Sequence, residues 1–198
     1  MKIPFRIMQL VKSALLTGVL LSSSAFADHV LNQEMSSVNF LSTKNVNVTE
    51  SHTFDTFVGA IDDSGKLTLD VDLTSVNTLI PIRNERMQNM LFNVTDYTKA
   101  SFSAQLDDSL LALTDGKSRA ATVTGDLTIS GVSKPITFDI VVTALADGKL
   151  SAVTTKPTLI NASDYNLDAG IEMLREVAML ENISKSVPFS FYVVFDNT

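Results

Sequence analysis

The chain has 198 residues, a formal net charge of −7, no cysteine and no tryptophan. Its length fits one domain or two small ones, and a content of 45% apolar and 19% charged residues is typical of a globular protein. The lack of cysteine excludes disulfides, cysteine-ligated metal sites and a cysteine nucleophile, and the acidic balance argues against nucleic acid as a partner.

Residues 1–27 have the features of a cleavable secretory signal peptide. Three basic residues accompany an apolar run over 14–21, and Ala25-Phe26-Ala27 forms a cleavage site of small residues. The run is too short for a membrane anchor, because a spanning helix needs about 20 apolar residues. We therefore expect cleavage after Ala27, export to a bacterial periplasm, and one mature domain over 28–198 without a transmembrane segment.

Alternation of apolar and polar residues is the strongest structural signal in the rest of the chain. In 67–73, a period of two places four aliphatic side chains on one face of a strand and the polar side chains on the other. The same period recurs in further segments, and weaker strands fit 54–62, 100–106 and 149–160. The clearly alternating segments are 38–40, 46–48, 121–129, 136–142 and 187–195. About eight half-buried strands indicate an antiparallel, all-β fold.

Turns and two short helices complete the expected order of elements. Glycine, which tolerates positive φ, follows aspartate or serine between strands at Gly65, Gly116 and Gly148. We expect one helix over Asn84–Leu91, with Met87, Met90 and Leu91 on one face, and a longer helix over 169–181 with Asp168 as its N-cap.

The sequence contains no recognisable catalytic or metal-binding motif. G-x-S-x-G, P-loop, H-E-x-x-H and G-x-G-x-x-G patterns are all absent. Of the two histidines, His29 follows the expected cleavage site closely, and His52 is predicted at the surface or at a strand end. The acidic pairs Asp62-Asp63 and Asp107-Asp108 lie beside turns, where carboxylates are usually solvated. We therefore expect neither a cofactor nor catalysis.

An antiparallel sheet with one apolar face must cover that face, and two architectures do so. The sheet can stack as a sandwich or close as a barrel, and an eight-stranded barrel can hold one small ligand. Composition does not choose between them. The inward-facing residues are aliphatic and rich in phenylalanine, so the ligand of any cavity is predicted to be apolar.

Three stretches resemble the YceI-like family of periplasmic polyisoprenoid-binding proteins. Ser37–Phe40 and Phe54–Ile61 are similar to the S-x-V-x-F and F-x-x-F-x-G-x-I strands of that family, and 76–102 is similar to its segment containing R-D-x-x-L and Y-P-x-x-x-F. The most specific stretch is Val123–Phe138, which follows V-x-G-x-L-T-x-x-G-V-x-K-P-V nearly throughout. One departure is Arg86-Met87, where the family usually has Arg-Asp.

The resemblance implies a lipocalin-like antiparallel barrel of roughly eight strands, with one or two short helices and an elongated apolar pore. Its ligand would be a polyisoprenoid, an isoprenoid quinone or another fatty-chain lipid, and the protein would be a periplasmic carrier, store or scavenger. A lipid-modifying enzyme in the same barrel and a ligand-free stress or interaction protein are the alternatives, and a homodimer is left open.

The residues expected to contact the ligand are inward aliphatic, aromatic and methionine side chains, with arginine at the mouth for a polar head group. Arg83 is a second candidate for that head group. The expected ligand-binding residues are Phe40, Phe54, Leu69, Val71, Arg86, Met87, Met90, Phe92, Phe102, Phe138, Met173 and Phe191.

Overall fold

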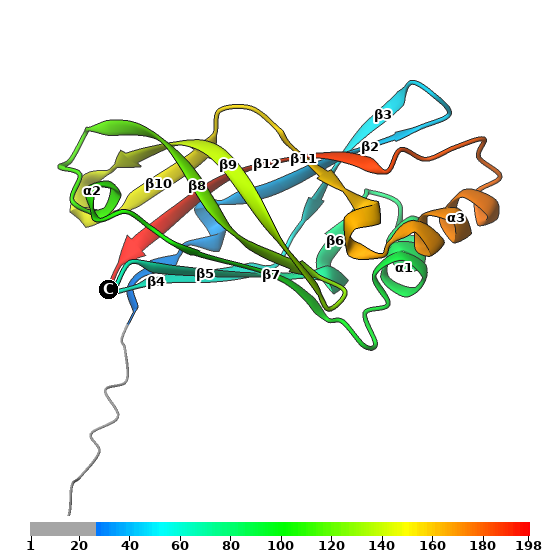
Figure 1. Cartoon of the computed structure of the whole chain (residues 1–198), viewed down its shortest axis with the longest axis horizontal. Coiled ribbons are helices and arrows are strands. Elements are labelled where there is room, and N and C mark those ends of the chain that lie inside the picture. The colour runs from blue at the N-terminus through cyan, green and yellow to red at the C-terminus, as the bar shows by residue number, and fades with distance from the viewer. Residues whose placement is uncertain (1–26) are drawn as a thin grey trace, which may run out of the picture.

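The computed structural model describes residues 27–198, which form a closed antiparallel barrel with eight strand positions (Figure 1). The ring runs β1-β4-β5-β7-β8-β9-β10-β12, and β12 pairs back onto β1 to close it. The predicted barrel is confirmed, and the sandwich is not formed. The strands are β1 Ala27–Leu31, β2 Ser37–Lys44, β3 Val48–Phe54, β4 Phe57–Asp62, β5 Lys66–Asp72, β6 Val76–Asn77, β7 Lys99–Gln105, β8 Ser118–Ile129, β9 Val132–Ala144, β10 Leu150–Thr154, β11 Thr158–Asn161 and β12 Ser186–Asn197.

Four of the eight positions are each shared by two short strands, namely β1 with β2, β3 with β4, β5 with β6, and β10 with β11. The predicted strand 54–62 is interrupted because the N–H groups of Asp55 and Thr56 bond to the carbonyl and the hydroxyl of Ser75 instead of to a ladder partner. The predicted strand 149–160 is interrupted before Pro157, which has no N–H to donate.

Three helices cover one end of the barrel, which Figure 1 shows on the side away from α2 and the C-terminus. These are α1 Pro81–Arg86, the π-helix η3 Met87–Phe92 and α3 Asp168–Val177, and α2 Asp108–Leu111 lies at the other end. At Gly170 of α3, an added Cβ would come within 2.6 Å of the Met90 carbonyl oxygen, so only glycine allows this close packing of α3 on η3. No helix within residues 27–198 is long and apolar enough to cross a bilayer.

Two helix predictions need correction. The stretch expected as one α-helix is α1 followed by the π-turns of η3. Asp168 is the first residue of α3 and not its N-cap; its carboxylate instead accepts a hydrogen bond from Ser163 and pairs with Lys185. The helix ends at Val177, before the predicted 181, because Met179 takes a left-handed backbone conformation that ends the helical hydrogen bonding.

The predicted alternation places the core. In β9, Phe138, Ile140, Val142 and Ala144 are buried, and the residues between them are more exposed. On the other strands too, every second side chain points into the barrel. The four clusters of buried apolar residues together surround the barrel axis.

Candidate functional site

An elongated cavity of about 490 Å³ occupies the interior of the barrel. Alternate residues of β12, from Val187 to Phe195, all line it. That span corresponds to about 26 Å of strand, since each residue advances roughly 3.3 Å. A site of this volume lies in the usual range for small-molecule pockets, and its length suits an extended chain.

Phenylalanine rings form much of the cavity wall. They belong to two clusters with neighbouring ring centroids 5.3–6.3 Å apart. One cluster packs near α1 and the other in the middle of the barrel: Phe40, Phe54 and Phe92, and then Phe102, Phe138, Phe189 and Phe191. The wall is therefore apolar and built from large, stiff side chains.

Ten of the twelve residues expected to contact a ligand lie on the cavity wall, brought together from β2, β3, β5, β7, β9, β12 and the α1–η3 segment. These ten are Phe40, Phe54, Leu69, Val71, Arg86, Met87, Phe92, Phe102, Phe138 and Phe191. Met90 and Met173 are not part of the wall.

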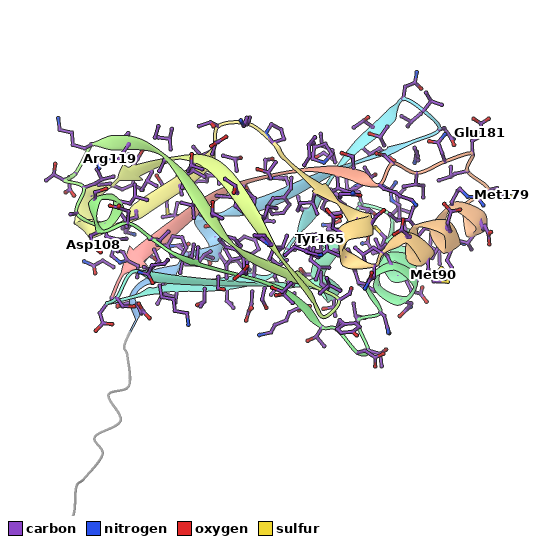
Figure 2. The ribbon with its side chains drawn as sticks, viewed as in Figure 1. Met90, Asp108, Arg119, Tyr165, Met179 and Glu181 are labelled. Atoms are coloured by element: carbon purple, nitrogen blue, oxygen red, sulfur yellow. The ribbon has the colours of Figure 1, made fainter. Side chains whose placement is uncertain are left out.

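The placement of Met90 was wrong because 87–92 is a π-helix. Its hydrogen bonds run from i to i+5, so residues four and five apart share a face instead of residues three and four apart. Met87, Leu91 and Phe92 accordingly face the cavity. Met90 lies at the α1–α3 end of the molecule (Figure 2), where its carbonyl group packs against Gly170.

The placement of Met173 was wrong for a simpler reason. Ile171, Leu174 and Ala178 of the α3 segment line the cavity at the spacing of i, i+3 and i+7 that defines one helical face. Met173 is two residues from Ile171, which puts it on the opposite face, where it is 47% exposed.

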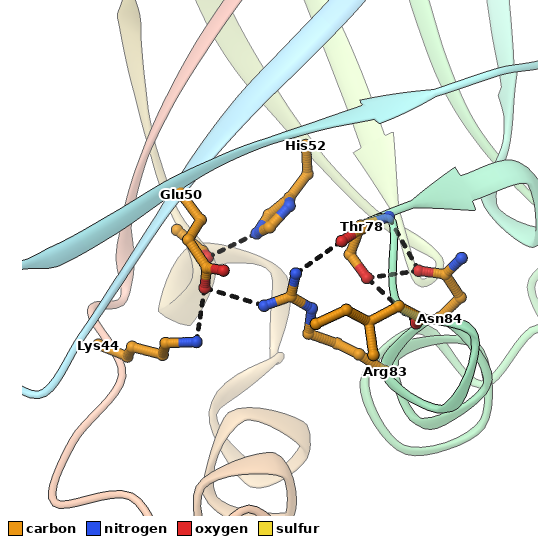
Figure 3. A network of polar contacts seen from close by, with 8 residues as sticks. Lys44, Glu50, His52, Thr78, Arg83 and Asn84 are labelled. Carbon is orange, nitrogen blue, oxygen red and sulfur yellow. Dashed lines mark hydrogen bonds and ion pairs between the residues drawn. The ribbon is translucent and has the colours of Figure 1, made fainter.

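Polar and charged side chains gather at one end of the cavity, close to α1 (Figure 3). Glu50 accepts bonds from the Nζ atom of Lys44 at 2.5 Å and from Nη1 of Arg83 at 2.9 Å. The bond from Lys44, helped by Arg83, lowers the pKa of the Glu50 carboxyl below its ordinary value. Arg83 also donates from Nη2 to the Thr78 carbonyl oxygen at 2.6 Å. This network joins β2, β3 and α1 at the end of the cavity where the partly exposed side chains of Lys44 and Arg83 line the wall, and we call this end the opening.

Arg86 reaches the same end of the cavity without a protein partner. It lines the wall and, among residues 27–198, makes no side-chain hydrogen bond or ion pair. The Nε atom of Arg83 is buried and also has no partner. The opening therefore offers donor groups that a polar ligand atom could accept from, while the rest of the cavity offers almost none.

His52 is buried in the wall, with 3% of its surface exposed, so the surface or strand-end prediction was wrong. Its Nε2 atom lies 2.9 Å from the hydroxyl of Ser42, its ring packs on Phe40, and its Nδ1 atom is buried without a partner. Burial lowers the pKa of His52 below its ordinary value of 6.5, and the charge of Arg83 lowers it further.

The lowered pKa of His52 predicts a pH dependence of stability. The unfolded chain binds the histidine proton more tightly than the folded chain does, so protonation of His52 favours unfolding. This destabilising effect is absent above the unfolded pKa of about 6.5 and grows as the pH falls below it. We expect the free energy of unfolding, measured by urea denaturation, to decrease between about pH 7 and pH 5. The variant His52→Gln should flatten that decrease, and an unchanged slope would contradict the assignment.

Arg83 and Arg86 were expected at this end of the cavity from the sequence, but Ser42, Lys44 and His52 were not, although a signal for them exists. Period two extends from Phe40 through Ser42 to Lys44, and from Phe54 back through His52 to Glu50. The same period on β12 adds Phe189, Val193 and Phe195 to Phe191. The inward face was expected to be aliphatic and rich in phenylalanine, and these polar residues depart from that expectation.

Comparisons with known proteins agree with this architecture. The YceI-like domain family matches residues 29–195. A polyisoprenoid binding domain from Saccharophagus degradans, implicated in plant cell wall breakdown, is 34% identical with a TM-score of 0.85, over 87% of this chain and 100% of that chain.

More distant structures share the fold alone. BcnA from Burkholderia cenocepacia is 20% identical with a TM-score of 0.62, over 83% of this chain and 98% of that one. A YceI protein from Campylobacter jejuni is 23% identical with a TM-score of 0.50, over 74% and 84%. No protein with a curated description matches the chain. Because the family match spans most of the sequence, the chain belongs to the YceI-like family.

Proposed function

We propose that this protein is a periplasmic carrier that encloses one long apolar lipid of the polyisoprenoid type. The observation that carries the proposal is the elongated cavity of about 490 Å³, apolar along its length and polar at one end. The polyisoprenoid binding domain from Saccharophagus degradans, at 34% identity over its whole length, supports the choice of ligand class.

Hydrophobic transfer supplies the driving force. Each 100 Å² of apolar lipid surface removed from water contributes about 2.5 kcal/mol of favourable transfer free energy. Because the cavity already exists, the lipid gains this free energy without a change in the conformation of the protein. The location of the hydrogen-bond donors determines the orientation of the ligand in the cavity. Its apolar chain would extend toward α2, and its polar end would lie near Arg83, Arg86 and His52.

The carrier is proposed to act after export, with residues 1–27 removed. Protein recovered from the periplasmic fraction of the producing bacterium should begin at Asp28 in N-terminal sequencing. Organic extraction and mass spectrometry of the same sample should yield about one long-chain lipid per protein. A retained leader would contradict the export proposal, and a sample without stoichiometric lipid would contradict the carrier proposal.

An enzyme in the same barrel is the second candidate, and the contact between Ser42 and His52 is the observation that favours it. A serine hydroxyl 2.9 Å from a histidine nitrogen is the contact that a nucleophile and its general base make. However, the Nδ1 atom of His52 has no group to orient the ring, as the third member of a triad would. Mass spectrometry separates the two functions, because a carrier releases its lipid intact and a hydrolase releases cleaved products.

A further inference from the structure

The three most exposed large apolar side chains among residues 27–198 all stand on left-handed backbone. They are Val46, Leu79 and Met179, which are 74%, 87% and 92% exposed, with φ angles of 74°, 61° and 53°. Every other non-glycine residue with positive φ in this part of the chain is asparagine, aspartate or serine. Left-handed backbone disfavours bulky and especially β-branched residues, so these three positions combine backbone strain with exposed apolar surface.

The three residues also belong to one end of the molecule. The N–H groups of Asn45 and Val46, at the tip of the β2–β3 hairpin, donate to the backbone and side-chain oxygens of Asn182 in the loop after α3. Glu50 joins Lys44 of that hairpin to Arg83 of α1, four residues after Leu79. In Figure 2, Met179 and Glu181 lie beyond α3 at the end opposite Asp108.

We call residues 44–48, 78–86 and 175–185 the mouth segments, because they also supply one end of the cavity wall. Lys44, Arg83, Arg86, Leu180 and Ser184 all line the cavity. The exposed apolar side chains thus surround the opening through which a lipid would pass. Ile80 and Ile82 add further exposed apolar surface to the same segments.

Charge distinguishes the mouth segments from the rest of the domain. They contain five basic residues and three acidic ones, Glu85, Glu176 and Glu181, and Glu50 of β3 adds a fourth acidic residue where it pairs with Lys44 and Arg83. The remainder of residues 28–198 contains seven basic and nineteen acidic residues. An anionic surface would therefore attract this end of the molecule and repel the other.

We propose that the mouth segments dock on a lipid bilayer, with Val46, Leu79 and Met179 inserted into the interfacial region. This inference rests on the proposed carrier function, since it gives the lipid a water-free path between membrane and cavity. Apolar side chains that enter the headgroup region together with nearby basic residues are the combination that binds proteins to a membrane surface. The strained backbone keeps the side chains exposed in place of packing into the barrel.

The test compares three chains in flotation with vesicles of pure phosphatidylcholine and of equimolar phosphatidylcholine and phosphatidylglycerol. The variant V46N/L79N/M179N removes the inserted side chains, and because asparagine tolerates left-handed backbone it should unfold at the same temperature as wild type or higher. The control V58N/L159N removes two exposed apolar side chains from the barrel wall, which are 62% and 65% exposed. All chains are produced from the full sequence and compared with the same N-terminus, read by sequencing.

Wild type and control should float with vesicles, more strongly with the anionic mixture and less strongly at high salt. The triple variant should lose about tenfold or more of this affinity. Equal flotation of wild type and triple variant, or no flotation of wild type, would overturn the proposal. A stable dimer in sedimentation that the triple variant loses would also overturn it, by assigning the mouth segments to a second copy.

The carrier function can fail separately from membrane docking. If wild type yields one extracted lipid per chain but does not float with vesicles, the carrier function stands and membrane docking is refuted. Wild type that floats through the mouth segments but contains no lipid supports docking and refutes the carrier.

Discussion

Replacing Ala152 by tryptophan should empty the barrel of lipid while leaving the fold intact. Ala152 lies on β10, pairs with Val142 and Val193, and lines the cavity. An indole ring there would occupy space that an extended chain needs. Filling a solid core in this way typically costs 1–3 kcal/mol, whereas about 490 Å³ of free volume should accept the ring at a lower cost. The extracted lipid per protein should fall to near zero.

The neighbouring variant Val153→Trp is a matched control. Val153 is next on the same strand, but its side chain is 40% exposed on the outer face, so this variant should retain its lipid. Because the chain has no natural tryptophan, the fluorescence of each variant reports only the introduced ring. Emission at shorter wavelength is expected for Ala152→Trp. A strongly destabilised variant that still contains a full complement of lipid would show that Ala152 does not line the binding site.

Leu69→Asp should be the most destabilising single change among those considered. Leu69 lies on β5 opposite Phe102 and points into the cavity. A carboxylate there would face an apolar wall without a partner, and an uncompensated buried charge costs about 3–5 kcal/mol. Since a domain of this kind is stable by roughly 5–15 kcal/mol, the urea midpoint should fall sharply or the protein should not fold.

Asp70→Asn, one residue further along β5, tests the same assignment from the other face. Asp70 pairs with Lys99 at 2.6 Å, and both side chains are at least one-third exposed. Exposed ion pairs contribute about 0.2–1 kcal/mol, so the urea midpoint should hardly move. If the two variants shifted the midpoint equally, the inward and outward faces of β5 would be wrongly assigned.

Prediction from sequence worked best where one physical rule acts on adjacent residues. A side chain on a strand must point to one face or the other, and only the inward face is protected from water, so alternation in 67–73 and 136–142 located both strands and their buried sides. It failed where the break in a strand depends on a distant group. Ser75, which captures the N–H groups of Asp55 and Thr56, lies about twenty residues away, and nothing within 54–62 indicates it.

The candidate site likewise contains residues whose positions the local sequence predicts and residues whose positions depend on distant parts of the chain. Seven of the ten expected contact residues on the cavity wall lie on strands and follow the local period of two, and the other three lie on α1 and η3. Met90 does not lie on the wall, because η3 is a π-helix, and its carbonyl group instead packs against Gly170 of α3, eighty residues later. The surroundings of His52 also depend on another element. Helix α1 brings Arg83 across the end of the barrel that Ser42 and His52 line.

The sequence by itself determined that this protein is an antiparallel β-structure with an aliphatic and aromatic interior. Alternation is a property of neighbouring residues, and the apolar face that it creates must be buried away from water. Its family pattern also indicated a barrel with a lipid-sized pore. Only the tertiary structure decided which residues form the polar end of the cavity and that Val46, Leu79 and Met179 lie exposed on the segments around it. Those features arise from residues more than thirty positions apart, and only closure of the sheet brings them together.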